Sequence, residues 1–457
     1  MAARTAPITA SISMTRSTSS SRRSRPTNRE NTGVQLNVGL LGLGTVGSQV
    51  AERLLQKRDS LARRTGVVLN LRRVLVRDAE RPRSIPSELI TDAPDEVLND
   101  PEIQVLVELM GGEEPARTYI ERGLRAGKHV VTANKVVMAK HGPELLELAG
   151  EMDVDIYFEA AVGGGIPLIS TFKVDLIAND IERIAAVING TTNYMLGRMG
   201  ADGLDYAAAL LEAQAAGFAE EDPTADVAGF DAVYKLSILA SIAFGARVHP
   251  DQVFREGIEG IDPLDFRYAK ELGYEIKLLA YAARPNGKIE ARVHPALVPV
   301  SHPLAQVEGA FNAVYIEGDL VGPVLLRGQG AGGRPTASAV VGDLLDLVFT
   351  IRKKAANRVL MTFDPDPPML PMADVVTKAY YRLRAEDRTG VLAQVGRVFG
   401  EEDVSIASMI QKDSIEEGTA ELVFTTHPAR DAALARARER IAELEPIRRV
   451  GAFFRVI

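Results

Sequence analysis

A lysine and a group of carboxylates lie close together in residues 217–235. Asp231 and Lys235 are four residues apart, so they share one face of a helix. Residues 236–244 are apolar on nearly every face, which is typical of a buried helix. A buried lysine that faces carboxylates stays charged and can donate a proton, whereas the alternative interpretation is a surface salt bridge at the helix entrance. Five acidic residues precede the lysine: Glu220, Glu221, Asp222, Asp226 and Asp231.

A second lysine, Lys135, ends the segment VTANK (residues 131–135) directly after a predicted strand. Ligands of an open parallel sheet bind outside the carboxyl ends of its strands, so Lys135 is placed to meet a nicotinamide ring and a substrate. The alternative is a solvated lysine on an ordinary loop. After the next predicted strand, residues 159–165 (EAAVGGG) contain three glycines, which suit either the close approach of a ligand or ion or a hinge between domains.

Two glycine-rich segments could hold a cofactor. Residues 42–47 (GLGTVG) match the pattern G-x-G-x-x-G directly after an apolar run and at the start of an amphipathic helix. In this context the glycines allow a tight turn, the approach of a pyrophosphate and close packing of helix on strand. Residues 328–339 form either a further cofactor contact or a return crossing between domains. We expect dinucleotide contacts from Gly42, Gly44, Thr45, Val46 and Gly47.

The choice between NAD and NADP depends on the residues that follow the second predicted strand. An acidic residue there selects NAD, whereas an arginine accommodates the 2′-phosphate of NADP. Arg77 and Asp78 are adjacent at this point, and Arg81 and Arg83 follow closely. The segment therefore favours NADP, with Arg77 as the contact, and Asp78 keeps NAD open.

The composition excludes several other chemistries. The chain has no cysteine, which removes disulfides, thiolate metal sites and cysteine nucleophiles. None of the six histidines has a helical metal-binding partner, and no tyrosine precedes a lysine by four residues as in short-chain dehydrogenases. The net charge of −8 argues against nucleic acid or an anionic membrane as a partner, and no apolar run reaches the ~18 residues of a membrane span. We therefore expect a cytoplasmic protein that acts on a small molecule.

The length of 457 residues suggests about three domains. Strands and helices alternate in residues 34–162, which predicts a Rossmann-type parallel sheet. Residues 163–330 predict a second, α+β domain, to which a family resemblance adds the expectation of substrate binding and dimerisation. Residues 331–362 predict a return segment that packs on the first domain. Residues 1–33 contain six arginines and one acidic residue and predict a disordered tail, with an organelle transit peptide as the alternative.

The C-terminal part follows a proline-rich segment. Four prolines in residues 363–372 predict a stiff extended linker, which we place at residues 363–376. Residues 377–457 then follow the order strand, helix, strand, strand, helix, strand, the ferredoxin-like βαββαβ unit. The predicted fold class is therefore α/β, with a Rossmann-type domain, an α+β domain and a small C-terminal βαββαβ domain.

Six segments in order resemble the homoserine dehydrogenase family over residues 37–457. The resemblance implies NAD(P)-dependent interconversion of L-aspartate 4-semialdehyde and L-homoserine, oxidation of a CH–OH group on the pathway to threonine, methionine and isoleucine. The C-terminal unit resembles an ACT regulatory domain, which implies feedback control by L-threonine, and the expected form is monofunctional, without a kinase domain. The segments are GLGTVG (42–47), VTANK (131–135), EAAVGGGIP (159–167), NGTTNYML (189–196), GFAEEDPTADVAGFDAVYKL (217–236) and GAGGRPTASAV (330–340).

The resemblance also implies roles for individual residues. Lys235 corresponds to the family's proton-donating catalytic lysine, and Asp226 helps to hold it. Lys135 corresponds to a second active-site lysine that contacts cofactor and substrate. Glu220 and Asp231 correspond to ligands of the amino end of homoserine.

Further implied contacts concern the cofactor, an ion and the assembly. Gly217 and Gly332 correspond to additional cofactor contacts, and relatives form dimers or tetramers. Two alternatives to this family stay open. One is another amino-acid-pathway dehydrogenase of the same fold. The other is a non-catalytic sensor of dinucleotides and amino acids, although a sensor has no use for acidic residues and a lysine around a buried helix. A structural monovalent cation, usually sodium, would involve Glu159 and the carbonyls of Val162, Gly164 and Ile166.

Overall fold

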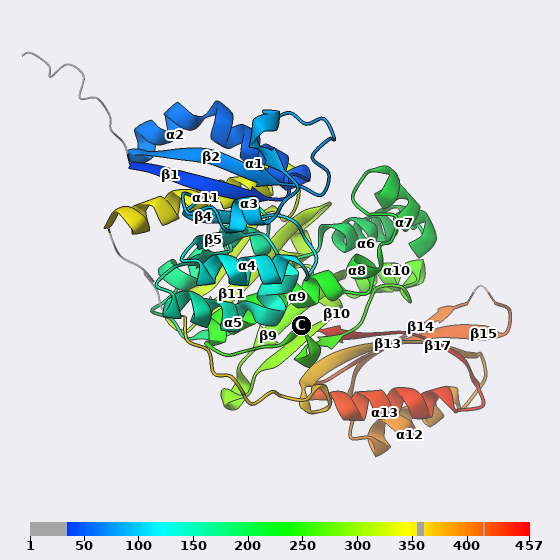
Figure 1. The fold of residues 1–457 in the computed structure, drawn as a ribbon. Helices are drawn as coiled ribbons and strands as arrows, with labels where there is room; N and C mark the ends of the chain where they lie inside the picture. The colour runs from blue at the N-terminus through cyan, green and yellow to red at the C-terminus, as the bar shows by residue number, and fades with distance from the viewer. Residues whose placement is uncertain (1–33, 354–360, 415) are drawn as a thin grey trace, which may run out of the picture.

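The structure is a computed structural model that describes residues 34–353, 361–414 and 416–457. The predicted N-terminal tail (residues 1–33) lies outside the described residues, as does the part of the predicted return segment at 354–360. The described chain forms two sheets (Figure 1), and the second sheet continues into the C-terminal unit. Among the described helices, none is long and apolar enough to cross a membrane.

The first sheet has six parallel strands in the order β3-β2-β1-β4-β5-β6. Helices cover both faces, so strands such as β4 are buried along their whole length, which explains their continuous apolar runs. The predicted Rossmann-type sheet is confirmed. Its strands are β1 (Val34–Leu41), β2 (Val67–Leu75), β3 (Ile90–Thr91), β4 (Val105–Glu108), β5 (His129–Thr132) and β6 (Ile156–Tyr157). Its helices are α1 (Thr45–Gln56), α2 (Arg58–Thr65), α3 (Asp95–Leu98), α4 (Ala116–Arg125), α5 (Lys135–Glu151) and, from much later in the chain, α11 (Gly333–Lys353), which packs against α1.

The second sheet begins with antiparallel strands in the order β12-β11-β7-β9-β10. Helix α9 (Phe230–Phe244) packs between α5 of the first unit and strands β9 and β10, and is buried around almost its whole circumference, as its apolar sequence predicts. It therefore carries its polar residues into the junction of the two units. The strands are β7 (Ile181–Val187), β8 (Phe254–Arg255), β9 (Tyr274–Ala283), β10 (Glu290–Pro299), β11 (Phe311–Gly318) and β12 (Gly322–Gln329). The other helices are α6 (Gly190–Asp202), α7 (Tyr206–Ala215), α8 (Thr224–Val227) and α10 (Pro263–Glu271).

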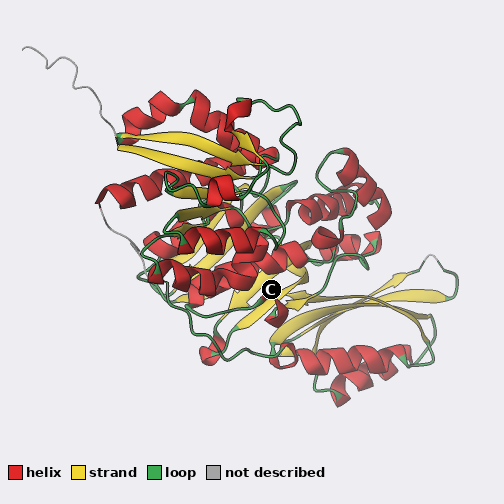
Figure 2. Cartoon of the chain, in the orientation of Figure 1, coloured by secondary structure: helices red, strands yellow, loops and turns green. Residues whose placement is uncertain are grey.

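The C-terminal unit has the predicted βαββαβ order, which is confirmed. Its two helices lie together on one face of its strands (Figures 1 and 2), over a separate apolar core that includes Tyr381, Phe399 and Phe424. The elements are β13 (Val376–Glu386), α12 (Val391–Glu401), β14 (Ile406–Asp413), β15 (Thr419–Thr426), β16 (Ala429–Arg430), α13 (Asp431–Ala442) and β17 (Ile447–Val456).

The sheet of the C-terminal unit is continuous with the second sheet. Strand β17 pairs in parallel with β10, where Ala296 lies opposite Arg455 and Leu297 opposite Val456. The connecting segment is extended, and hydrogen bonds fix it to the second unit, for example from the Leu370 N–H to the carbonyl of Ile289 at 2.8 Å. The two units are thus joined by backbone hydrogen bonds as well as by side chains.

A buried ion pair lies at this junction. The guanidinium of Arg382 on β13 donates to Asp265 on α10 at 2.5 and 3.2 Å, and the Asp265 side chain is fully buried. The Tyr380 hydroxyl donates to the same carboxylate at 3.4 Å. Such a pair costs desolvation energy, so its contribution depends on both partners being present.

Replacing Asp265 by Asn keeps the shape of the side chain and removes the charge that faces Arg382. Because Arg382 then keeps only the longer contacts with Glu421 at 3.5 Å and Asp262 at 3.7 Å, we expect Asp265→Asn to lower the free energy of unfolding by up to about 3–5 kcal/mol. Urea unfolding followed by circular dichroism measures the loss. The matched control is Lys412→Ala, which removes an exposed 2.9 Å pair with Glu271 on the same helix and should cost less than about 1 kcal/mol. Equal losses in the two variants would contradict this assignment.

Candidate active site

A cleft lies at the carboxyl ends of the first sheet, where the first unit meets the second. Strands β1, β4, β5 and β6 contribute the loops that follow them, and α9 contributes Lys235. The lining residues are Gly44, Thr45 and Val46 after β1, residues 108–111 at the end of β4, residues 133–135 after β5, Ala160, Ala161, Gly163 and Gly164 after β6, and Gly330, Ala331 and Thr336 around the start of α11.

The turn after β1 is shaped for an anionic ligand. A Cβ on Gly47 would lie 2.2 Å from the carbonyl oxygen of Gly42, so only glycine allows this approach of helix to turn. A Cβ on Gly44 would meet no atom within 4 Å, and α1 begins there without a capping side chain or an acidic residue in its first turn. The first amides of α1 are therefore available to phosphate oxygens, which fits a dinucleotide.

The two predicted lysines meet on one carboxylate. Asp231 on α9 accepts a hydrogen bond from the Lys235 ammonium at 2.7 Å through Oδ2, and its Oδ1 accepts one from Lys135, the first residue of α5. The Lys235 ammonium also donates to the backbone carbonyl of Ile188 at 2.9 Å. The side chains of Asp231 and Lys235 are only 4% and 9% exposed, whereas that of Lys135 is 41% exposed. This geometry places a charged network at the floor of the cleft.

Each charged group of the network stabilises the ionised form of its partners. Burial opposes ionisation of the Asp231 carboxyl, but Lys235 and Lys135 outweigh it and hold the pKa of Asp231 well below its usual range. Burial also opposes the charge on Lys135, yet Asp231, with Asp226 and Glu220 behind it, raises the pKa of Lys135 above its ordinary value. At neutral pH Asp231 is therefore ionised and Lys135 protonated.

Asn189 is a member of the network that the sequence did not reveal as a site residue. It precedes α6, and its amide donates to Asp226 Oδ1 at 2.7 Å and to Asp231 Oδ2 at 2.9 Å. An asparagine before a helix is an ordinary cap, so only the long-range contacts distinguish it.

Glu108 is a second buried acid that sequence reasoning did not single out. It ends β4, is fully buried, and accepts hydrogen bonds from the Thr132 hydroxyl at 2.6 Å and the Met110 N–H at 2.8 Å. Burial raises the pKa of Glu108 above its ordinary value, although these hydrogen bonds oppose the shift. The residue fixes the loops after β4 and β5 that line the cleft. Its signal in the sequence is an acid at the end of an otherwise apolar run.

The other predicted contacts lie around the cleft. Glu220 is exposed and close enough to Lys135 to influence its charge. Arg77 is exposed after β2, while Gly217 and Gly332 have φ angles of +74° and +110° at the ends of their loops. Within the described chain, these last three residues lie outside the lining of the cleft.

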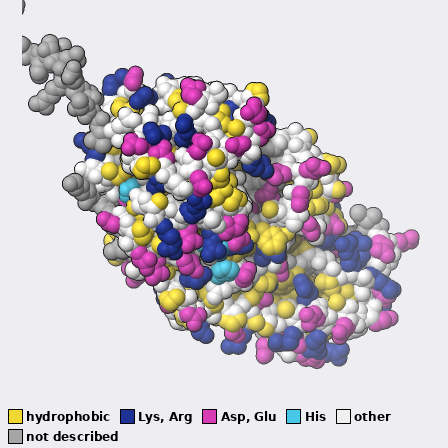
Figure 3. All heavy atoms as spheres, in the orientation of Figure 1, with side chains coloured by type: hydrophobic (Ala, Val, Ile, Leu, Met, Phe, Trp, Pro, Cys, Tyr) yellow, Lys and Arg dark blue, Asp and Glu magenta, His cyan; other side chains and the backbone are white. Residues whose placement is uncertain are grey.

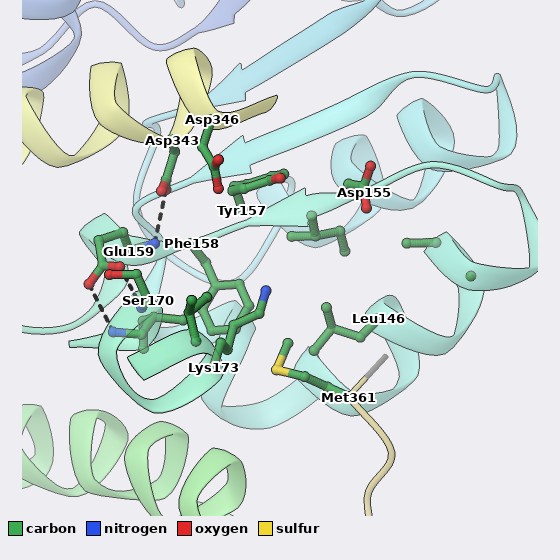
Figure 4. A pocket seen from close by; sticks show the side chains of 15 residues that line it. Leu146, Asp155, Tyr157, Phe158, Glu159, Ser170, Lys173, Asp343, Asp346 and Met361 are labelled. Carbon is green, nitrogen blue, oxygen red and sulfur yellow. Dashed lines mark hydrogen bonds between the residues drawn. The ribbon is translucent and has the colours of Figure 1, made fainter. Parts of the chain in front are cut away.

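Glu159 fixes the turn after β6 (Figure 4). Its carboxylate accepts backbone N–H groups from Leu168, Ile169 and Ser170 at 2.5–2.8 Å, and its own N–H donates to Asp343 at 2.9 Å. The described residues contain no group of three or more His, Asp or Glu side chains that could hold a metal ion.

Comparison with known proteins identifies the family. A family model for the homoserine dehydrogenase NAD binding domain matches residues 42–159, one for homoserine dehydrogenase matches residues 167–345, and one for the ACT domain matches residues 382–446. A homoserine dehydrogenase of Mycobacterium tuberculosis is 44% identical over 434 residues, which cover 92% of this chain and 97% of that protein. The chain belongs to the homoserine dehydrogenase family. It is an NAD(P)-dependent oxidoreductase.

Solved structures agree with this assignment. A homoserine dehydrogenase from Thiobacillus denitrificans has a TM-score of 0.87 and 41% identity, and the match covers 93% of this chain and 98% of that one. A hyperthermophilic archaeal homoserine dehydrogenase mutant in complex with NADPH has a TM-score of 0.60 and 32% identity, covering 69% of this chain and 98% of that one.

Acidic and basic side chains are interspersed on the face of the molecule in Figure 3.

Proposed function

We propose that Lys235 exchanges the proton of the reaction that interconverts L-aspartate 4-semialdehyde and L-homoserine. The observation that carries the proposal is the buried lysine that lines the cleft and is held by Asp231 and the Ile188 carbonyl. A bound nicotinamide supplies the hydride or accepts it. Lys235 protonates the developing alkoxide in one direction and takes the hydroxyl proton in the other, a contribution of about 10²–10⁴ in rate. Lys135 stabilises the same negative charge.

The carboxylates around the lysines supply the contacts for the substrate's amino group. Glu220 is exposed at this position and can pair with an ammonium ion. Asp231 contributes through Oδ1, the oxygen that accepts from the partly exposed Lys135 side chain. Asp226 stays with Asn189 and helps to hold the network that positions Lys235.

Lys235→Ala tests the central assignment. We expect kcat to fall by about 10²–10⁴ in both directions while the dissociation constant of NADP(H) changes little, because the lysine acts on the substrate oxygen. Steady-state assays and cofactor titration measure the two quantities. The matched control is Lys277→Ala, which removes another buried lysine, one that donates to the Val307 carbonyl at 2.7 Å. A Lys235→Ala protein that stays folded and keeps its kcat would disprove the assignment.

We further propose NADP as the preferred cofactor. The Asp78 carboxylate accepts a hydrogen bond from the Glu80 N–H at 3.0 Å and so stabilises the local turn. Arg77 is exposed after the end of β2. The archaeal homoserine dehydrogenase mutant in complex with NADPH shows that a relative of this fold can hold the phosphorylated cofactor.

Arg77→Ala should raise the KM for NADP by about tenfold, which corresponds to about 1.4 kcal/mol, and leave the KM for NAD nearly unchanged. The reason is that only NADP carries the 2′-phosphate. Parallel assays with the two cofactors check this, with Arg53→Ala on the outer part of α1 as the control. If both cofactors respond alike to Arg77→Ala, then Arg77 does not bind the 2′-phosphate.

L-Threonine is the effector that we propose for the ACT domain. Arg455 on β17, held by Asp431 at 2.6 Å, donates to Glu256 of the catalytic unit at 2.7 Å. Two residues later, the Ile258 N–H donates to the carbonyl of Val227 at 2.9 Å, four residues before Asp231. This chain of contacts supports communication from the ACT domain to the catalytic helix.

Glu256→Gln should keep the basal kcat and raise the threonine concentration for half inhibition about fivefold or more, because the variant weakens the coupling between the units. Inhibition curves measure the change, with Lys412→Ala at the exposed interdomain pair as the control. An unchanged curve would contradict the proposed path. If L-threonine does not inhibit the unaltered protein, the proposal that threonine is the effector is wrong.

The remaining proposals concern the ion and the assembly. We propose that a monovalent cation, sodium in the first instance, binds the carbonyls of Val162, Gly164 and Ile166 beside Glu159. Gly163 and Gly164, with φ of +73° and +55°, give this turn a shape that supports such coordination. We also propose a homo-oligomer.

A further inference from the structure

Asn189 lies between the strand and the helix that flank the charged network. It follows β7, caps α6 and is only 5% exposed. Its amide oxygen accepts the Thr192 N–H at 2.8 Å and the Thr192 hydroxyl at 2.9 Å. The cap therefore fixes which way the amide faces, because a flipped amide would place its oxygen against two carboxylates.

The amide nitrogen of Asn189 uses both of its hydrogens on the network. One bond goes to Asp226 Oδ1 at 2.7 Å and the other to Asp231 Oδ2 at 2.9 Å. Asp231 Oδ2 is the same oxygen that accepts from Lys235, and the preceding carbonyl, that of Ile188, accepts the second hydrogen bond of that lysine. Residues 188 and 189 thus supply contacts both to Lys235 and to its partner carboxylate.

We infer that Asn189 is a positioning residue for proton transfer: it holds the carboxylates of Asp226 and Asp231 together and thereby fixes Lys235. Two carboxylates that accept hydrogen bonds from the same amide nitrogen repel each other. A neutral donor between them offsets the repulsion without adding charge. The inference rests on the proposed role of Lys235. The other charged groups that face the network are Lys135 from α5 and Glu220.

Two substitutions separate this role from simple helix capping. Serine and aspartate both cap helices well. Asn189→Ser keeps a capping oxygen but is too short to bridge the carboxylates, and Asn189→Asp keeps the shape but replaces the two donors by a negative charge. A residue that only caps α6 would tolerate both changes.

The test measures kcat for homoserine oxidation from pH 6 to pH 10, together with NADP affinity and the melting temperature. We expect kcat to fall about tenfold or more in Asn189→Ser with cofactor affinity retained. In Asn189→Asp a carboxyl group replaces the two donors, so the charge balance of the network changes and the acidic limb of the profile should move by about one pH unit. The control Asp205→Ser also replaces a capping side chain by serine, at the exposed start of α7. It should alter neither kcat nor the pH profile.

Three outcomes decide the matter. A kcat within twofold of the unaltered protein for Asn189→Ser, with an unmoved pH limb in Asn189→Asp, would overturn the inference and leave Asn189 as a cap. If Asn189→Asp fails to fold, the uncharged Asn189→Ser variant decides alone. A Lys235→Ala protein with normal kcat would instead refute the proposed function, and the two failures are therefore distinguishable.

Discussion

The buried carboxylate of Asp231 is the constraint on which the site depends. An ionised acid at 4% exposure is stable only when cations and donors surround it, and here each comes from a different element: α5, α9 and the turn before α6. The first and second units must therefore pack closely for the charge to be tolerated. In this way the energetic demand of one side chain ties the first sheet to helix α9.

The position of the site follows from the topology of the two sheets. Helix α9 can be apolar nearly all round because it lies between α5 and the strands β9 and β10, with Lys235 of its second turn lining the cleft. Glu108 and Thr132 at the ends of β4 and β5 then fix the loop from which Lys135 extends. The candidate active site thus lies at the carboxyl ends of the first sheet, where the first unit meets the second.

Periodicity and local motifs were sufficient to predict the Rossmann-type sheet, the buried helix and the βαββαβ unit, because each depends on residues close in sequence. The residues around the cleft were predicted where a motif carries them, as with Lys235, and their roles stay predictions. Asn189 and Glu108 escaped because their contacts span 37 and 24 residues, and neither a helix cap nor an acid at the end of an apolar run indicates by itself which distant residues it meets. The pairing of β10 with β17 is also beyond local patterns, since their register depends on packing between units.

The shared sheet has a consequence for how the chain can be divided. Strand β17 pairs with β10 only at Ala296 and Leu297, whereas β8 pairs with Arg292 and Val293, so removing the C-terminal unit would expose a short stretch of backbone on a strand that is almost all buried. An uncovered apolar edge is a template for pairing with another chain. On β10, Pro295 and Pro299 flank Ala296 and Leu297 and already limit pairing with another chain, so a shortened form would need little further protection of this edge.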